Sequence, residues 1–180
     1  MKDKLLEQAK HEFSPKQRLT ALLVLAPLFL IILPYILITL GSRIDQWLQW
    51  SPILYEPYNL ILGGLLIVAG WLFGIWSVNI QFTLGRGTPV PLMATQELII
   101  RPPYSYCRNP MALGAIVMYL GVAILVGSMG SVVLVLFGTG ILLTYIKRIE
   151  EREMEIRFGQ EYLNYKKQTP FLIPRFRKLG

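Results

Sequence analysis

The sequence predicts an all-α integral membrane protein with about four transmembrane helices, two of which form a short helical hairpin in the C-terminal half. Apolar residues make up 53% of the 180 residues and charged residues only 16%, with a mean hydropathy of +0.47. Soluble domains average about 45–50% apolar and 25% charged residues, and a chain of this size buries only about 70% of its surface on folding. The remaining apolar surface therefore needs lipid around it.

Four apolar blocks account for the predicted spans. The blocks 19–40 and 58–78 are about 30 Å long or slightly longer as helices, which matches the hydrocarbon core of a bilayer. The blocks 112–126 and 132–146 reach only about 22 Å each. They are joined by the uncharged turn sequence 127–131, so we expect a tight hairpin.

Two prolines and two amphipathic segments complete the predicted architecture. Pro27 and Pro34 are expected to kink the first span, which lipid tolerates where neighbouring groups satisfy the freed carbonyls. An interfacial helix is expected in 1–18, ending near Ser14-Pro15, because apolar residues recur there at helical spacing; a frayed tail is the alternative. A charged helix is expected to follow the hairpin and to end at Phe158-Gly159. The apolar residues of the first segment are Leu5, Leu6, Ala9 and Phe13.

The distribution of basic residues predicts the orientation. Of the 18 lysines and arginines, five lie in 1–18, three in 79–111 and nine in 147–180, against one in 41–57. With four crossings the three basic segments share one side, which the positive-inside rule makes cytoplasmic. We expect both termini in the cytoplasm and a bacterial inner membrane as the location. Anionic lipid headgroups then account for the net charge of +7, so no nucleic acid and no obligate protein partner are expected.

The residues outside the spans narrow the chemistry. The single cysteine, Cys107, and the single histidine, His11, exclude an internal disulfide and a cysteine or histidine metal cluster. The hairpin brings Arg108-Asn109-Pro110 back toward Lys147 to Glu151, and polar groups at that depth predict a functional site. A salt-bridge patch that only anchors the helix ends is the alternative. Glu153 and Glu155 are assigned to pairing along the helix.

These residues resemble the superfamily of isoprenylcysteine carboxyl methyltransferases and phospholipid methyltransferases, small integral membrane enzymes that use S-adenosylmethionine. The motif GPY-x-Y-x-RHP-x-Y-x-G corresponds to Pro103 to Gly114, and the following Glu-Glu pair to Glu150-Glu151. A later motif, FG-x-EY-x-x-Y, begins at Phe158. Asn109 replaces the usual histidine and Ala112 the usual tyrosine. The resemblance covers 58–176, so 1–180 is expected to be a single methyltransferase-like domain.

The resemblance implies methyl transfer from S-adenosylmethionine to a lipidic or hydrophobic small-molecule acceptor at the cytoplasmic face. It implies catalytic roles for Arg108, Asn109 and Glu150, with Arg86 or Arg101 orienting an anionic substrate head. Asparagine can hydrogen-bond a cofactor but does not titrate near neutral pH as histidine does. No metal is implied. The implied cofactor-binding set is Tyr104, Tyr106, Arg108, Asn109, Pro110, Gly114, Glu150, Glu151 and Tyr162.

Three readings remain open at the level of sequence. Sterol reductases resemble the same superfamily in their C-terminal half, so an NADPH-dependent membrane reductase is the second enzyme, although the chain is short for one. A non-catalytic scaffold or assembly protein is the third reading.

Cys107 is a weak candidate nucleophile, because no histidine lies near it to lower its pKa. The aromatic residues Tyr162 and Tyr165 either stack on an adenine or pack as a lid, and lid packing is favoured.

Overall fold

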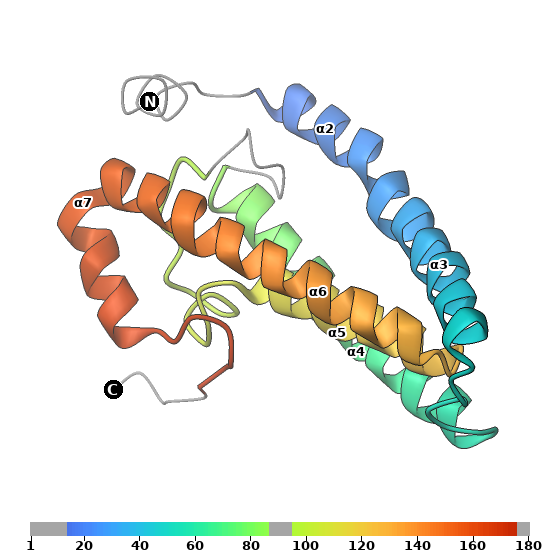
Figure 1. The fold of residues 1–180 in the computed structure, drawn as a ribbon. Coiled ribbons are helices and arrows are strands. Elements are labelled where there is room, and N and C mark those ends of the chain that lie inside the picture. The colour runs from blue at the N-terminus through green and yellow to red at the C-terminus, as the bar shows by residue number, and fades with distance from the viewer. Residues whose placement is uncertain (1–13, 87–94, 176–180) are drawn as a thin grey trace.

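The computed structural model describes residues 14–86 and 95–175, and the regular elements in this part of the chain are all helices. The predicted all-α fold is therefore confirmed. Figure 1 shows α4, α5 and α6 running side by side and α7 folding back at one end. The elements are α2 (Pro15–Pro27), the π-helical segment η1 (Leu28–Ile32), α3 (Leu33–Leu48), α4 (Tyr58–Thr83), α5 (Pro110–Leu125), α6 (Met129–Tyr145), the π-helical segment η2 (Ile146–Glu150) and α7 (Glu151–Gln168).

Three continuous helices are long and apolar enough to cross a membrane: Pro15–Leu48, Tyr58–Thr83 and Met129–Gln168; the helix Pro110–Leu125 is apolar but shorter. The most apolar stretch of the first helix has no buried residues, and so large an exposed apolar face belongs in lipid. The first and last helices are longer than the predicted blocks 19–40 and 132–146. The last helix continues past its apolar block because no proline or glycine interrupts the chain between Ile141 and Phe158.

The start of α2 agrees with the predicted boundary at Ser14-Pro15. The Ser14 hydroxyl accepts a hydrogen bond from the Gln17 backbone N–H, and the Gln17 side chain accepts one from the Ser14 N–H, which is a capping box. Leu5, Leu6, Ala9 and Phe13, on which the predicted interfacial helix rests, lie outside the described residues.

The π-helical segment η1 explains how a lipid-exposed helix accommodates Pro34. In a π turn each N–H reaches back five residues, and the Leu33 N–H indeed donates to the Leu28 carbonyl. The next donor in this pattern is Pro34, which has no N–H, so the Phe29 carbonyl needs another partner. The hydroxyl of Tyr119 on α5 donates to it at 2.8 Å. A neighbouring helix thus satisfies the freed carbonyl.

Helices α4 and α5 pack at close range through glycines. A Cβ on Gly70 would lie 2.5 Å from the Met118 nitrogen, and one on Gly114 would lie 2.8 Å from the Cα of Gly74. Neither position has room for a side chain, and small residues of this kind allow helix backbones to approach in a membrane. This contact sets the direction of α5, and with it the position of the loop that precedes α5.

The hairpin turn is fixed against α3. Gly127 has φ +67°, and α6 begins two residues later with Ser128 as its N-cap. Asp45 of α3 accepts hydrogen bonds from the Gly130 N–H at 2.7 Å and from the Ser128 hydroxyl at 2.5 Å, at the positive end of the α6 dipole. A Cβ on Gly41 would lie 2.1 Å from the Ser131 oxygen. The predicted hairpin is confirmed, and α3 holds its turn.

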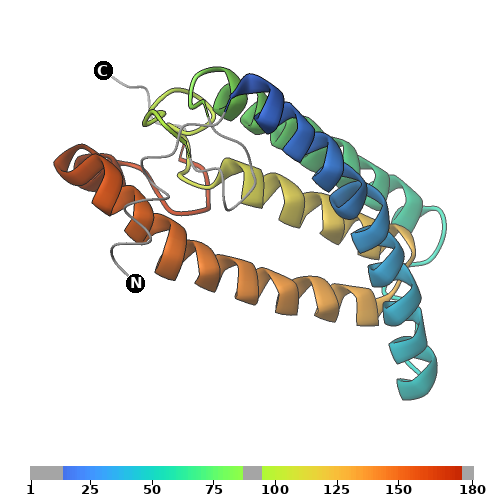
Figure 2. The ribbon, with the colours of Figure 1, turned by 90° about the horizontal axis from the view of Figure 1, so that it is seen from above.

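Helix α7 bends sharply at Gly159, which has φ +52°. The sequence predicts a helix end here; the chain does leave helical geometry, but it resumes the helix and continues to Gln168. One residue in the left-handed region is enough to turn the axis, and the residues that follow are compatible with helix. Figure 2 shows the second half of α7 and the chain after it lying near the loop before α5.

Candidate active site

The loop 104–109 and the start of α7 meet in a buried ion pair. Arg108 Nη2 lies 2.8 Å from Glu151 Oε1, and the two side chains are only 10% and 5% exposed. The contact lacks the angles of a hydrogen bond, so its attraction is chiefly electrostatic. The prediction that the hairpin brings Arg108 to the glutamate pair is confirmed.

Lys166 joins Arg108, Glu151 and Glu155 in a group of paired charged side chains, the charge cluster. Lys166 was not among the site residues predicted from the sequence. Its Nζ lies 2.7 Å from Glu151 Oε2 and 2.8 Å from Glu155 Oε1, so it joins the two halves of α7 across the bend at Gly159. The Arg108 Nη1 also donates to the Lys166 carbonyl at 2.9 Å. The bend was visible in the sequence as Phe158-Gly159, but its direction was not.

The chain after α7 forms a strap, residues 169–175, that lies along the loop 104–109. The Arg108 N–H donates to the Pro170 carbonyl at 2.9 Å, and the Arg175 N–H donates to the Tyr106 carbonyl at 3.0 Å. The Asn109 side-chain amide donates to the Phe171 carbonyl at 2.9 Å. The Arg108 guanidinium also lies 5.7 Å from the centre of the Phe171 ring, within cation–π range.

Buried tyrosines hold the loop 104–109 against α4 and α7. The Tyr104 hydroxyl lies 3.2 Å from Gln81 Oε1 on α4, and the Tyr165 hydroxyl donates to the Tyr104 carbonyl at 2.6 Å. The Tyr162 and Tyr165 rings are in contact at 6.0 Å between centroids. Burial, the Cys107 thiol and the Glu150 carboxylate raise the pKa of Tyr104, so its hydroxyl stays protonated and acts as a structural hydrogen-bonding group.

Glu150 differs from its neighbour Glu151. It is half-buried, and its carboxylate makes no hydrogen bond or ion pair with any residue in the described ranges. Two donors of the adjoining loop are also buried without a hydrogen-bond partner in this part of the chain, Arg108 Nε and Ser105 Oγ. Buried polar atoms normally have partners, so the cluster retains unused capacity for hydrogen bonding a ligand.

Three residues of the predicted cofactor-binding set make packing contacts in the structure. Gly114 permits a close approach of α4, and its implied approach to a cofactor stays a prediction. Tyr106 sets its ring against Trp76 at 6.3 Å, and Pro110 is buried as the first residue of α5.

The predicted substrate-orienting arginines are surface residues in the structure. Arg86 pairs with Glu97 at 3.3 Å, with the two side chains 64% and 57% exposed, and Arg101 is exposed. Among the described residues, no ion pair joins either arginine to Glu150 or Glu151. The structure therefore brings neither of them into the charge cluster.

Cys107 is a core residue. Its side chain is fully buried, and burial raises the pKa of its thiol to about 11, against a smaller lowering by the backbone of Asn109. A protonated, enclosed thiol is a poor nucleophile.

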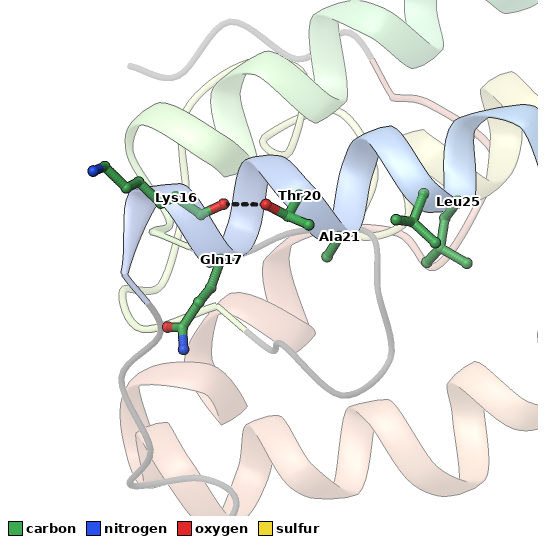
Figure 3. A pocket seen from close by; sticks show the side chains of 6 residues that line it. Lys16, Gln17, Thr20, Ala21 and Leu25 are labelled. Carbon is green, nitrogen blue, oxygen red and sulfur yellow. Dashed lines mark hydrogen bonds between the residues drawn. The ribbon is translucent and has the colours of Figure 1, made fainter.

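A hollow of about 480 Å³ lies along α2. Figure 3 shows its lining side chains on one helix, with the Thr20 hydroxyl donating to the Lys16 carbonyl. The hollow is open, and no residue of the charge cluster lines it. The lining residues are Lys16, Gln17, Thr20, Ala21, Val24 and Leu25.

Two curated proteins are similar in sequence to this chain. The chain is 24% identical over 157 residues to methanethiol S-methyltransferase 2 of Bradyrhizobium diazoefficiens, covering 78% of this chain and 58% of that protein. It is 24% identical over 128 residues to methanethiol S-methyltransferase of Mycobacterium tuberculosis, covering 71% of this chain and 46% of that protein. The chain thus spans about half the length of these curated relatives. No solved structure matches it significantly.

The phospholipid methyltransferase family model matches residues 58–161. This range includes α4, the loop with Arg108, the hairpin and the glutamate pair, and thus the Arg108–Glu151 ion pair, while Lys166 lies beyond it. Since the match covers more than half of the chain, the chain belongs to the phospholipid methyltransferase family.

Proposed function

We propose that the protein transfers a methyl group from S-adenosylmethionine to a small hydrophobic acceptor at the inner rim of the membrane. The observation that carries this proposal is the buried contact of Arg108 with Glu151, which joins the two motifs of the family in one place. Membership of a methyltransferase family and two relatives named as methyltransferases agree with it.

The residues present fit the polar end of S-adenosylmethionine. That end carries a carboxylate and an ammonium group, which need a cationic donor and an acidic acceptor. Arg108 Nε is a buried donor without a partner among the described residues, and Glu150 is a half-buried carboxylate whose lone pairs are not used there. Arg108 therefore binds the carboxylate, and Glu150 accepts from the ammonium or from a hydroxyl.

The sulfonium group of the bound cofactor supplies an activated methyl group. The chain then has to align donor and acceptor, because proximity and orientation provide most of the rate in such a displacement. Arg108 and Glu151 hold the loop and α7 at a fixed separation. As a bond from the acceptor atom to the methyl carbon forms, the bond from that carbon to the sulfonium sulfur would break. The Glu150 oxygen that does not bind the cofactor would receive the proton that a thiol, amine or hydroxyl acceptor releases.

The acceptor reaches this site from the lipid. The cluster lies at the end of α6 where α7 begins, next to apolar helix faces, so an acceptor dissolved in the bilayer has a short path to it. The names of the two relatives favour a small thiol, and the family name favours a phospholipid. The distribution of basic residues supports a cytoplasmic position for the cluster and both termini.

The test supplies purified protein with methyl-labelled S-adenosylmethionine and, separately, methanethiol or total membrane lipids. Mass spectrometry then measures labelled dimethyl sulfide and labelled lipid. Glu150→Gln is expected to lower product formation at least tenfold, while Arg152→Gln, an exposed neighbour on α7, leaves it unchanged. Absence of labelled product from every acceptor would contradict the proposal, and equal loss in both variants would remove Glu150 from the mechanism.

A further inference from the structure

The strap 169–175 is attached to the loop 104–109 by three hydrogen bonds of two kinds. Two of them join backbone to backbone, from Arg108 to Pro170 and from Arg175 to Tyr106. The third comes from a side chain, the amide of Asn109, which donates to the Phe171 carbonyl at 2.9 Å. Of the three hydrogen bonds only this one is donated by a side chain, and Phe171 lies beyond the range 58–161 that matches the family model.

The geometry defines what position 109 must provide. A carbonyl oxygen accepts and cannot donate, so the side chain opposite Phe171 has to be a donor. Asparagine meets this condition through Nδ2, and histidine meets it through a ring N–H. Aspartate has nearly the same shape as asparagine but presents only acceptors when ionised, so it would face the carbonyl with a like partial charge.

The strap is placed where it affects Arg108. Its Pro170 carbonyl holds the Arg108 backbone, and its Phe171 ring lies against the Arg108 guanidinium. Arg108 is only 10% exposed, and the strap is one of the segments that cover it. Release of the strap would let water reach the guanidinium and would loosen its orientation toward the unused Nε position.

We infer that Asn109 is a positioning residue: its side-chain amide holds the strap 169–175 against Arg108 and thereby sets the affinity for the methyl donor. The second half of this inference rests on the proposed function. One N–H of the Asn109 amide is committed to the Phe171 carbonyl, and the inference assigns its role to this bond and not to a contact with the transferred methyl group.

The experiment compares three substitutions at one position in the full chain. Asn109→Asp and Asn109→Ala both remove the donor, the second without adding charge, and Asn109→His keeps a donor. Asn164→Asp makes the same chemical change at an exposed position of α7, where the Asn164 oxygen accepts from Gln160, and serves as the matched control. Hydrogen exchange of the peptide 169–175 reports on the strap, because the Arg175 N–H is protected by its bond to Tyr106.

Loss of the donor is expected to raise exchange in the strap about tenfold, the effect of one hydrogen bond on a local opening equilibrium. The KM for S-adenosylmethionine should rise by a similar factor in Asn109→Asp and Asn109→Ala, with kcat changed less than about threefold. Asn164→Asp should stay close to the unsubstituted protein in both measurements, and Asn109→His, which keeps a donor, should keep hydrogen exchange in the strap close to that of the unsubstituted protein.

Exchange in the strap that is unchanged by Asn109→Ala and Asn109→Asp would overturn the inference, whatever their activity. A loss in kcat with an unchanged KM would overturn it too, since it would place Asn109 in the reaction itself. If the unsubstituted protein transfers no methyl group, the proposed function fails, while the exchange measurement still decides whether Asn109 holds the strap.

Discussion

Replacing Glu151 by glutamine should destabilise the protein far more than the same change at an exposed glutamate. Glu151 is 5% exposed and faces two cations, Arg108 at 2.8 Å and Lys166 at 2.7 Å. Removing one partner of a buried ion pair costs about 3–5 kcal/mol, because the remaining charge stays buried without compensation. Since Lys166 is 34% exposed, water offsets part of this loss, and we expect about 3 kcal/mol.

The matched control is Glu97→Gln. Its partner Arg86 lies 3.3 Å away, but both side chains are more than half exposed, and such pairs contribute about 0–1 kcal/mol. The assay is equilibrium unfolding in mixed micelles with increasing sodium dodecyl sulfate, followed by tryptophan fluorescence. The double variant with Arg108→Met should recover part of the loss, because it removes the uncompensated cation.

Equal free energies of unfolding for Glu151→Gln and Glu97→Gln, within about 0.5 kcal/mol, would refute this reasoning. That result would mean that water reaches the Arg108 and Glu151 charges in solution. The ion pair would then resemble the anchoring patch at the helix ends that the sequence left open as an alternative.

Three further predictions concern the scaffold. Tyr119→Phe removes the donor to the Phe29 carbonyl and should cost about 0.6–1.7 kcal/mol in the same unfolding assay; no change would show that another group satisfies that carbonyl. Gly41→Ala places a Cβ where α6 begins and should destabilise by about 1–3 kcal/mol, whereas Gly138→Ala, with open space around it, should be neutral; equal effects would contradict the observed contact. Cys107, with a pKa of about 11, should resist maleimide at pH 7.5 until detergent unfolds the protein, and rapid labelling of folded protein would disprove its burial.

The arrangement of helices could be predicted from the sequence because it depends on composition and turn chemistry. Apolar blocks gave the spans, and the uncharged sequence at 127–131 gave the hairpin. From the hairpin alone it followed that Arg108 and Glu151 share one end of the molecule. The helix lengths were less accurate, because a polar sequence continues a helix as long as nothing breaks it.

The detailed contacts of the site could not be predicted, because they depend on the direction of a bend. Gly159 turns α7 back, and only this turn brings Lys166 to Glu151 and the strap to Asn109. A positive φ at one glycine sets the angle between the two halves, and the sequence carries no signal for that angle. For the same reason, the sequence could not distinguish Glu150, which is unpaired among the described residues, from the paired Glu151.

The central claim is that the cluster around Arg108 and Glu150 binds S-adenosylmethionine, and calorimetry on the purified protein in detergent tests it most directly. We expect saturable binding of S-adenosylmethionine, weakened about tenfold or more by Glu150→Gln, and no binding of NADPH. Binding of NADPH in its place would indicate a reductase. Binding of neither nucleotide would contradict the account and leave a protein without this catalytic role.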